Sequence, residues 1–470
     1  MKIKHFFLMA LAIFALSACN NDELVPSGNE PQEQGYLILS LSSPNSPNPN
    51  PPAYTSGTAT DNGTATENQI NSVIVVLANA TGTISTVINP SITNGVTEKF
   101  KVLLGDHYVY ALVNSPITIR EGDNINQVIS LAEAIGGFTD GSLFMSNPRN
   151  SSAEQAGVFV TITNTNSLTN PAKINIHVDR VACKINDETT TPTVTALAAT
   201  TDNLVDDVDV EGFAILNVNK EFNLIQTWDT YNANDLILLS EVLSTPVAST
   251  GLVAEQYLYN ISQYTSLTKN AGDTITAITD LTLGKPELFR NVPLYVSENR
   301  PIITDYGNSG ITAGRGETTG VIYKVQAKNG GSDLGTFYKC KNILSEDLDD
   351  VQALPEFTGK TLSTLSNPEL RALGIKVYEN GVMYYSHFIR DPNEAHQHAD
   401  LNYYAVFRNS SYKLKINSIS ALGDDVPGGA VVDPSKPGEP GNPPIDTEDA
   451  YLEVSVTVNP WILNLIDIDF

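Results

Sequence analysis

The chain has 470 residues and a formal net charge of −26 at pH 7, because 53 aspartate and glutamate residues outnumber 27 lysine and arginine residues. A surface of this charge repels nucleic acid, so we exclude DNA and RNA as partners. The same charge keeps an exported protein soluble. At this length the chain can bury one large hydrophobic core or two, and we favour two.

The N-terminus has the pattern of an export signal. Two lysines precede the apolar run 6–15, which is too short to span a bilayer by itself. Small residues then lead into Cys19, a pattern typical of a lipobox, in which the signal peptide is removed and the cysteine is lipidated. We expect residues 1–18 to be a lipoprotein signal peptide, Cys19 to anchor the precursor in the outer membrane, and residues 19–34 to be a linker. The alternative is an ordinary signal peptide with a chance cysteine.

Short runs of Val, Ile, Leu, Tyr and Thr dominate the remaining chain, separated by clusters of Asn, Gly, Pro, Asp and Ser. This pattern predicts an all-β protein built from β-sandwich domains with a few short helical insertions. Helices are predicted at residues 125–135, from an apolar stripe, and from Ser366 to Gly374, where a capping box starts the segment. The clearest predicted strands, in chain order, are residues 36–41, 73–77, 108–113, 173–178 and 383–385.

Two proline-rich segments interrupt the strands. Residues 43–52 follow the first strand and lack the amide donors that a central strand needs, so we expect an exposed loop over residues 43–67. Residues 427–444 favour a semi-rigid, polyproline-like spacer.

Two apolar segments follow the spacer. The alternation of Leu452, Val454, Val456 and Val458 with polar residues predicts a half-buried strand, and residues 461–470 predict a second one. An apolar strand on a spacer needs a sheet edge to pair with. That edge belongs either to a neighbouring chain or to the same domain, where the two strands would form a hairpin.

Residues suited to catalysis or metal binding are sparse. The chain contains no His-Glu-x-x-His, Gly-x-Ser-x-Gly or phosphate-loop motif, so we expect neither an enzyme nor a cofactor. The densest polar cluster contains His396, His398 and Asp400, which are candidates for a metal site, with a polar loop between two strands as the favoured alternative. Cys183 and Cys340 are favoured as buried free thiols, although one disulfide would fit an oxidising compartment.

The end of the chain is similar to a known family. Residues 403–419, followed by Leu422-Gly423, resemble the C-terminal pattern of the fimbrillins of Bacteroidetes, which build type V pili. The spacer and the stretch 454–461 resemble the ending of that family, particularly that of the major subunit of the short (minor) fimbriae. Weaker similarities lie at residues 67–77, 104–114, 144–147 and 178–182.

The resemblance implies two transthyretin-like β-sandwich domains, which we place at residues 35–186 and 187–423. A spacer at 424–449 and C-terminal donor strands at 450–470 would follow. The function implied is that of a structural subunit of a cell-surface fimbria, which supports adhesion and biofilm formation. Its implied partners are other copies of itself, other pilus subunits and a maturation protease.

The resemblance also implies polymerisation by donor-strand exchange. In that mechanism a protease cuts behind the first strand, the strand leaves, and a C-terminal strand of the next subunit takes its place. The displaced strand here matches Tyr36, Leu37, Leu39 and Leu41. The candidate donor side chains are Leu452, Val454, Val456, Val458, Trp461, Ile462, Ile466, Ile468 and Phe470.

The expected cleavage signal departs from the family pattern. The family's protease usually cuts after Arg or Lys, yet the chain has neither between His5 and Lys99. Either a protease of different preference acts in the loop 43–67, or the first strand stays and the protein is a pilus anchor or terminator. A surface glycan-binding lipoprotein that uses exposed tyrosines is the alternative outside the family.

Overall fold

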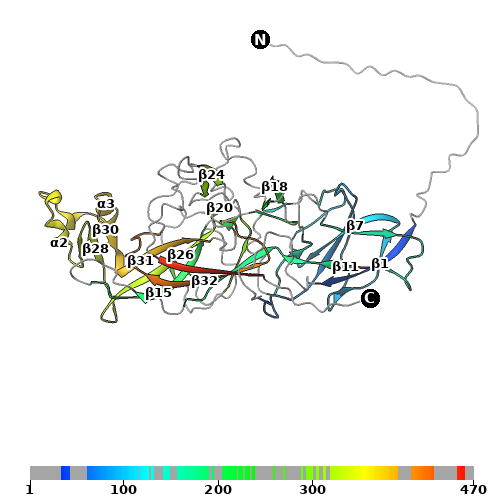
Figure 1. Cartoon of the computed structure of the whole chain (residues 1–470), viewed down its shortest axis with the longest axis horizontal. Helices are drawn as coiled ribbons and strands as arrows, with labels where there is room; N and C mark the ends of the chain where they lie inside the picture. Colours follow the sequence, from blue (N-terminus) through cyan, green and yellow to red (C-terminus); the bar gives the residue numbers. More distant parts are fainter. Residues whose placement is uncertain are drawn as a thin grey trace, which may run out of the picture.

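Figure 1 shows the computed structural model of the chain. The residues that the structure describes are 33–42, 61–115, 117–125, 129–131, 141–148, 156–189, 193–194, 204–216, 218–219, 221–225, 228–232, 235–238, 258–259, 268–269, 287–288, 293–299, 303–305, 311–313, 318–389, 404–427 and 452–460.

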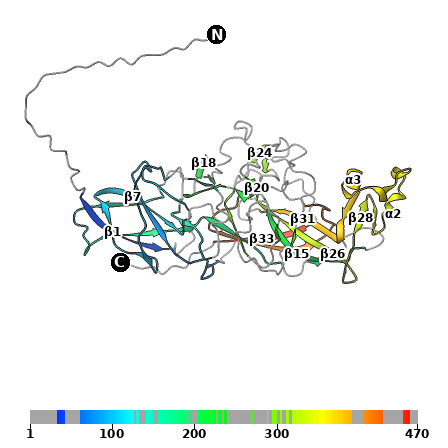
Figure 2. The same ribbon diagram turned by 180° about the vertical axis from the view of Figure 1, so that it is seen from behind.

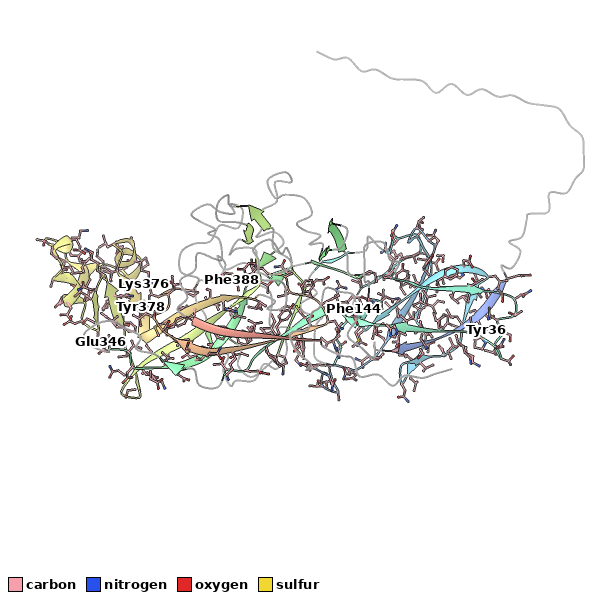
Figure 3. The ribbon with its side chains drawn as sticks, viewed as in Figure 1. Tyr36, Phe144, Glu346, Lys376, Tyr378 and Phe388 are labelled. Atoms are coloured by element: carbon pink, nitrogen blue, oxygen red, sulfur yellow. The ribbon has the colours of Figure 1, made fainter. Side chains whose placement is uncertain are left out.

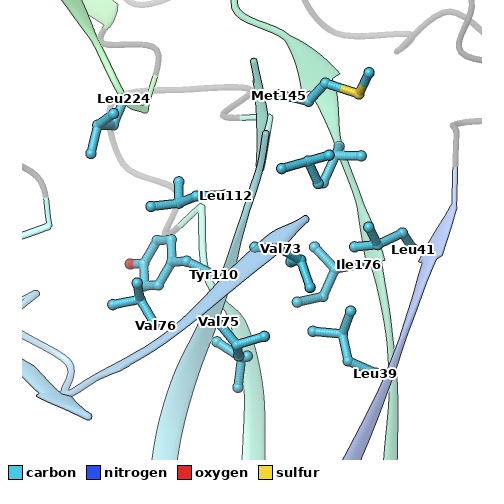
Figure 4. Close-up of a cluster of buried hydrophobic side chains, with 14 of the residues drawn as sticks. Leu39, Leu41, Val73, Val75, Val76, Tyr110, Leu112, Met145, Ile176 and Leu224 are labelled. Atoms are coloured by element: carbon cyan, nitrogen blue, oxygen red, sulfur yellow. The ribbon is translucent and has the colours of Figure 1, made fainter. Parts of the chain in front are cut away.

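The first part of the chain forms two sheets around one core. Leu39 and Leu41 from one sheet share this core with Val73 and Val75 from the other (Figure 4). The first sheet contains β1 (Gln34–Ser42), β4 (Ile92–Thr93), β5 (Val96–Thr97), β6 (Phe100–Leu103) and β11 (Ala172–His177). The second contains β2 (Val73–Ala78), β3 (Ile84–Ile88), β7 (Gly105–Val113), β9 (Met145–Ser146), β10 (Val158–Ile162) and β12 (Asp179–Arg180).

The second part of the chain also forms two sheets around a core. Phe213 and Tyr323 pack in this core at 6.1 Å between ring centroids, with Tyr412 also buried there. One sheet contains β13 (Ala182–Asp187), β14 (Thr193–Val194), β23 (Leu294–Ser297), β32 (Ser410–Ile419) and β33 (Leu452–Pro460). The other contains β15 (Asp207–Leu216), β26 (Gly320–Asn329), β27 (Ser332–Asp333) and β31 (Val382–Phe388).

Further short strands pair in separate two-stranded sheets. They are β8 (Ile129–Leu131) with β17 (Glu221–Asn223), β16 (Val218–Asn219) with β20 (Leu258–Tyr259), β18 (Trp228–Asn232) with β19 (Asp235–Leu238), β21 (Thr268–Lys269) with β22 (Glu287–Leu288), and β24 (Ile303–Asp305) with β25 (Ile311–Ala313).

A small lobe is inserted between β27 and β31. It has a separate core that includes Val351, Leu362 and Ile375. Its elements are β28 (Phe337–Cys340), β29 (Ile343–Ser345), α2 (Leu348–Gln352), η6 (Pro355–Phe357), η7 (Leu362–Thr364), α3 (Asn367–Ala372), β30 (Lys376–Tyr378) and η8 (Glu379–Gly381). Figures 1 and 2 show β1 and β7 toward one end of a long molecule and this lobe at the other end.

The all-β fold class predicted from the sequence is confirmed. The predicted helix that begins at Ser366 is present as α3, and the capping box between Ser366 and Glu369 is formed. The helix predicted at 125–135 is wrong at Ile129–Leu131, which form β8 and pair with β17. A stripe of apolar residues is compatible with either structure, and here a distant strand supplied the partner. Within the described residues, no helix is long and apolar enough to cross a membrane.

Candidate assembly site

Strand β1 lies in the interior of its sheet. It pairs in parallel with β11 over Leu37–Ser42, and antiparallel with β6 over Gln34–Leu37 and with β5 at Ser40. Two neighbouring edges therefore depend on β1 for their hydrogen bonds. Removing β1 would leave a gap in the sheet, with the unpaired edge of β11 on one side and the unpaired edges of β5 and β6 on the other. Another extended segment can fill this gap.

The core face of β1 is made of three leucines. Leu37 and Leu39 are 0% exposed and Leu41 is 1% exposed, and fully burying a leucine contributes about 1.5–3 kcal/mol. Tyr36, the fourth residue predicted for the displaced strand, lies on the opposite, half-exposed face, where Lys101 Nζ is 6.0 Å from its ring centroid. Figure 3 shows Tyr36 at the end of the molecule farthest from the lobe that carries Glu346.

Hydrogen bonds from the β4–β5 hairpin add to those of the ladder. The Leu39 amide donates to Thr97 Oγ1 at 3.0 Å, and the Leu41 amide donates to the Gly95 carbonyl at 2.8 Å. Gly95 has φ of +79°, a conformation that glycine adopts without strain. The backbone around β1 is thus shaped to receive a strand at this position.

The two ends of the predicted loop 43–67 both lie where the two parts of the chain meet. Ser42 accepts a hydrogen bond from the Val178 amide at 3.2 Å, immediately before β12. Asp61 accepts one from Ser411 of β32 at 2.8 Å. Residues 43–60 lie outside the described residues, and the predicted exposure does not extend to Glu67, which is 1% exposed.

The C-terminal strand pairs within its own chain. β33 lies antiparallel to β32 from Leu452, opposite Ile419, to Pro460, opposite Ser410. Val454 and Val456 are half-buried and pack against the second core. The sequence left open whether this strand pairs with a neighbouring chain or within its own domain. For residues 452–460, the structure shows the second alternative. The other predicted donor residues, Trp461, Ile462, Ile466, Ile468 and Phe470, lie outside the described residues.

Most of the remaining predicted site residues are not among the residues that the structure describes. Cys19 and the metal candidates His396, His398 and Asp400 are not among the described residues. Within the described part, no group of three or more His, Cys, Asp or Glu side chains could hold a metal ion. Cys183 and Cys340 are both buried free thiols, and burial raises the pKa of the Cys183 thiol well above its ordinary value.

Sequence analysis missed a polar cluster at the meeting of the two parts. Lys184 of β13 is 2.8 Å from Glu67 Oε1 and 3.3 Å from Asp61 Oδ2. The Tyr295 hydroxyl also donates to Glu67 Oε1, at 2.7 Å. Two signals could have found it: a lysine among apolar residues in a predicted core strand, and the spacing of Thr64 and Glu67, which is that of a capping box.

The electrostatics of this cluster favour charged carboxylates. Burial alone would raise the pKa of Glu67, but hydrogen bonds from Lys184, Tyr295 and the Thr64 amide outweigh it and lower that pKa below its ordinary value. Asp61 behaves likewise: burial is outweighed by its hydrogen bonds and by the charge of Lys184, and its pKa is lowered.

Residues of the fimbrillin-like pattern hold the same junction. Asn409, with φ of +57°, donates from its side chain to Asp179 Oδ1 at 3.1 Å and accepts from the Arg180 amide at 3.3 Å. Burial raises the pKa of Asp179 to about 6, against the lowering effect of Arg408 and Arg180. The Arg-Asn pair at 408–409 therefore lies between the two cores.

Comparison with known proteins places the C-terminal region in a family. Residues 376–467 match the family described as major fimbrial subunit protein type IV, fimbrillin, C-terminal, a stretch that includes β31, β32 and β33. The molecule is thus an all-β protein with a fimbrillin C-terminal region. The match confirms, for residues 376–467, the fimbrillin resemblance seen in the sequence. No curated protein matches the chain.

Several solved structures are similar over most of the chain. A fimbrilin from Porphyromonas gingivalis is 12% identical, with 91% of this chain and 98% of that chain covered and a TM-score of 0.42. The tip fimbrial protein Mfa3 from the same species, with a C-terminal truncation, is 13% identical, with 91% and 100% covered and a TM-score of 0.34. A fimbrial assembly protein from Parabacteroides distasonis is 9% identical, with 82% and 91% covered and a TM-score of 0.31.

Proposed function

We propose that this protein is a structural subunit of a cell-surface fimbria, that it is exported as an outer-membrane lipoprotein through Cys19, and that it polymerises by donor-strand exchange. The observation that carries the proposal is the position of β1 within its sheet. Its apolar face is fully buried, its neighbours need its hydrogen bonds, and the segment behind it is proline-rich. Its role is structural rather than catalytic, and its partners are further copies of this chain and other pilus subunits.

The proposed division into two sandwich domains fits the buried clusters, with one exception. Most members of the first cluster precede Cys183, and the second begins there. Leu224, Ile225 and Tyr295, however, pack with the first core although they lie beyond residue 187, in the proposed second domain. Figure 4 shows Leu224 in this core. The second domain therefore inserts apolar side chains into the first, which supports a rigid subunit.

The polarity of β1 supports head-to-tail assembly. β1 begins beside Leu103 and ends beside His177, so its first residues lie at the free end of the first domain and its last residues lie at the junction. A donor strand is joined to its own subunit through its N-terminal side. When it enters the next subunit from the free end of the first domain, its C-terminus points toward the junction. The donor then runs in the same direction as β1, parallel to β11.

The described pairing of β33 divides the proposed donor into two parts. Residues 452–460 already have a partner strand in β32, and two of their valines pack against the second core. The residues that follow Pro460 are mostly apolar, alternate apolar and polar side chains from Ile466 to Phe470, and are joined directly to this strand. We therefore place the inserted portion in residues 461–470 and assign β33 the role of fixing the direction in which it leaves the subunit.

An anchor or terminator is the second candidate, favoured by the absence of Arg and Lys between His5 and Lys99. Such a subunit keeps β1 and accepts no donor. The N-terminal residue of protein purified from its native surface separates the two functions. A start at lipidated Cys19 favours the anchor, and a start between residues 43 and 61 favours the processed subunit.

The assembly mechanism itself is tested by a designed cut. A recognition site for a specific protease is inserted after Asn50, and the same site is inserted between Gly330 and Gly331, an exposed turn, as a control. Cutting after Asn50 should release the β1 peptide and give SDS-resistant polymers, visible as a ladder and as fibres by electron microscopy. Cutting the control should leave monomers. A chain that is cut after Asn50 and stays monomeric contradicts donor-strand exchange.

A further inference from the structure

Three side chains form a row across the sheet of the second domain. Lys184 of β13 lies opposite Tyr295 of β23 on one side and opposite Ser411 of β32 on the other. Because side chains alternate along a strand, Cys183 and Ile185 point into the second core while Lys184 points to the opposite face. We call Tyr295, Lys184 and Ser411 the docking row.

One acidic segment of the first domain occupies the docking row. Glu67 Oε1 accepts a hydrogen bond from Tyr295 and lies 2.8 Å from Lys184 Nζ, which donates to Glu67 Oε2 at 3.2 Å. Asp61 Oδ2 accepts a hydrogen bond from Ser411 and lies 3.3 Å from Lys184 Nζ. We call residues 61–69 the clamp segment. Its two carboxylates thus meet all three side chains of the docking row.

The clamp segment has a built-in shape. The Glu67 amide donates to Thr64 Oγ1 at 3.1 Å, and the Thr64 amide donates back to Glu67 Oε2 at 2.7 Å. These reciprocal bonds are those of a capping box, here closing a turn rather than starting a helix. They fix the Glu67 carboxylate so that its other oxygen faces the docking row.

The first domain grips the same segment from the other side. Arg180 of β12 is 0% exposed, and its guanidinium donates to the Glu67 carbonyl at 3.3 Å and to Asn68 Oδ1. A few residues further on, the chain enters β2, an interior strand of the first domain. Two buried cations, Arg180 and Lys184, therefore balance two carboxylates on one short segment that touches both domains.

We propose that the clamp segment is an interdomain clamp, a binding site of the second domain for an acidic segment of the first, with Glu67 as its central residue. Removing one partner of a buried ion pair leaves a desolvated charge, so the contact is either complete or strongly weakened. The clamp begins at Asp61, after the proline-rich segment, and the hydrogen bonds and ion pairs given above join it to residues of β12, β13, β23 and β32. If β1 leaves during assembly, as the proposed function requires, we infer that the clamp keeps the two domains together afterwards.

The test is hydrogen exchange of the clamp amides in the full chain. Tyr295→Phe combined with Ser411→Ala removes two hydroxyl donors and leaves both cores intact. We expect exchange at residues 64–69 to rise at least ten-fold while β2 and β26 stay unchanged. The matched control is Lys324→Met, which breaks a pair with Glu211 inside the second domain at 2.7 Å and should leave the clamp unchanged. Unchanged exchange at residues 64–69 in the double variant would overturn the proposal.

A second measurement uses a protease that cuts after glutamate. Burial should protect the Glu67 bond in the wild-type chain, and Lys184→Met should make it at least ten times more susceptible. Continued protection of Glu67 in Lys184→Met, or equal loss of protection throughout both domains, counts against a specific clamp.

The chain cut after Asn50 completes the test: hydrogen exchange at residues 64–69 should stay within two-fold of that in the uncut chain, whether or not the cut chain polymerises. A large rise on cutting would mean that chain continuity, and not the docking row, holds the segment.

Discussion

Arg408 and Glu298 form an ion pair that is almost fully withdrawn from water. The two residues are 6% and 9% exposed, and Arg408 Nε donates to Glu298 Oε1 at 2.9 Å. Arg408 also donates through Nη1 to the carbonyl of Leu224 at 3.2 Å, and the Ser146 hydroxyl of the first domain donates to that same carbonyl at 2.5 Å. A residue of the fimbrillin-like pattern is therefore part of the contact between the domains.

Arg408→Met should destabilise the protein by about 3–5 kcal/mol, because it leaves the Glu298 carboxylate buried without its cation. Urea denaturation measures the loss. The double variant Arg408→Met with Glu298→Leu should recover part of it, since no buried charge remains. Lys341→Met, which breaks the exposed pair with Glu356, is the control and should leave the midpoint unchanged. Equal stability of the wild type and Arg408→Met would contradict a structural role for the pair.

Replacing leucines in β1 should expose the difference between its two faces. Leu39→Ala removes a side chain that is 0% exposed and should cost about 2–5 kcal/mol. Ile38→Ala, on the half-exposed face, should cost much less. Thermal unfolding of the uncut chain gives both values. Similar losses at the two positions would mean that the core face of β1 is not what holds it in the sheet.

Acid should weaken the junction through Glu67. Its folded-state pKa is lowered, so its contribution to stability is present above the ordinary value of 4.5 and is lost as the pH falls below it. Asp179 has the opposite sign: its pKa is raised, so its contribution is lost as the pH rises through about 6.

The comparison of wild type with Glu67→Gln isolates the Glu67 contribution. Between about pH 5 and pH 3 the thermal midpoint of the wild type should fall more steeply than that of the variant. Part of the slope should remain, because the pKa of Asp61 is also lowered. Glu121→Gln, an exposed carboxylate, serves as the control and should show the wild-type slope. Parallel curves for wild type and Glu67→Gln would rule out this assignment.

The sequence predicted those elements whose pattern is local. Apolar runs between turn residues predicted strands at the positions of β1, β2, β7 and β11. The capping box at Ser366 predicted the start of α3. The junction was missed because its contacts join distant residues: Asp61 and Ser411 are 350 positions apart. A polar residue such as Asp61, in a polar stretch of the sequence, gives no local sign that it will be partly buried against a distant strand. The family resemblance supplied the function, which local patterns alone did not.

Cys19→Ala should abolish lipidation and release the precursor from the outer membrane, because the proposed anchor is the lipid on this thiol. Incorporation of a labelled fatty acid and membrane fractionation measure the effect. Ser17→Ala, within the small residues before the cysteine, should preserve both and serves as the control. Unchanged membrane association of Cys19→Ala would remove the basis for the lipoprotein assignment.

The two proposed parts of the donor should respond differently to an added charge. Val456→Asp places a carboxylate at a half-buried position against the second core, so it should lower the stability of the monomer as well as block assembly. Ile466→Asp changes a residue of the proposed inserted portion, so it should leave the thermal midpoint unchanged and still prevent polymers after the designed cut. Thr457 lies next to Val456 but on the opposite face of β33, because side chains alternate along a strand. Thr457→Asp should therefore have a mild effect on monomer stability and on assembly.

Deleting residues 461–470 should give a folded monomer that accepts a donor but supplies none, and it should cap chains of wild-type subunits. Fibres formed by Ile466→Asp or by the deleted chain alone would show that the donor lies elsewhere.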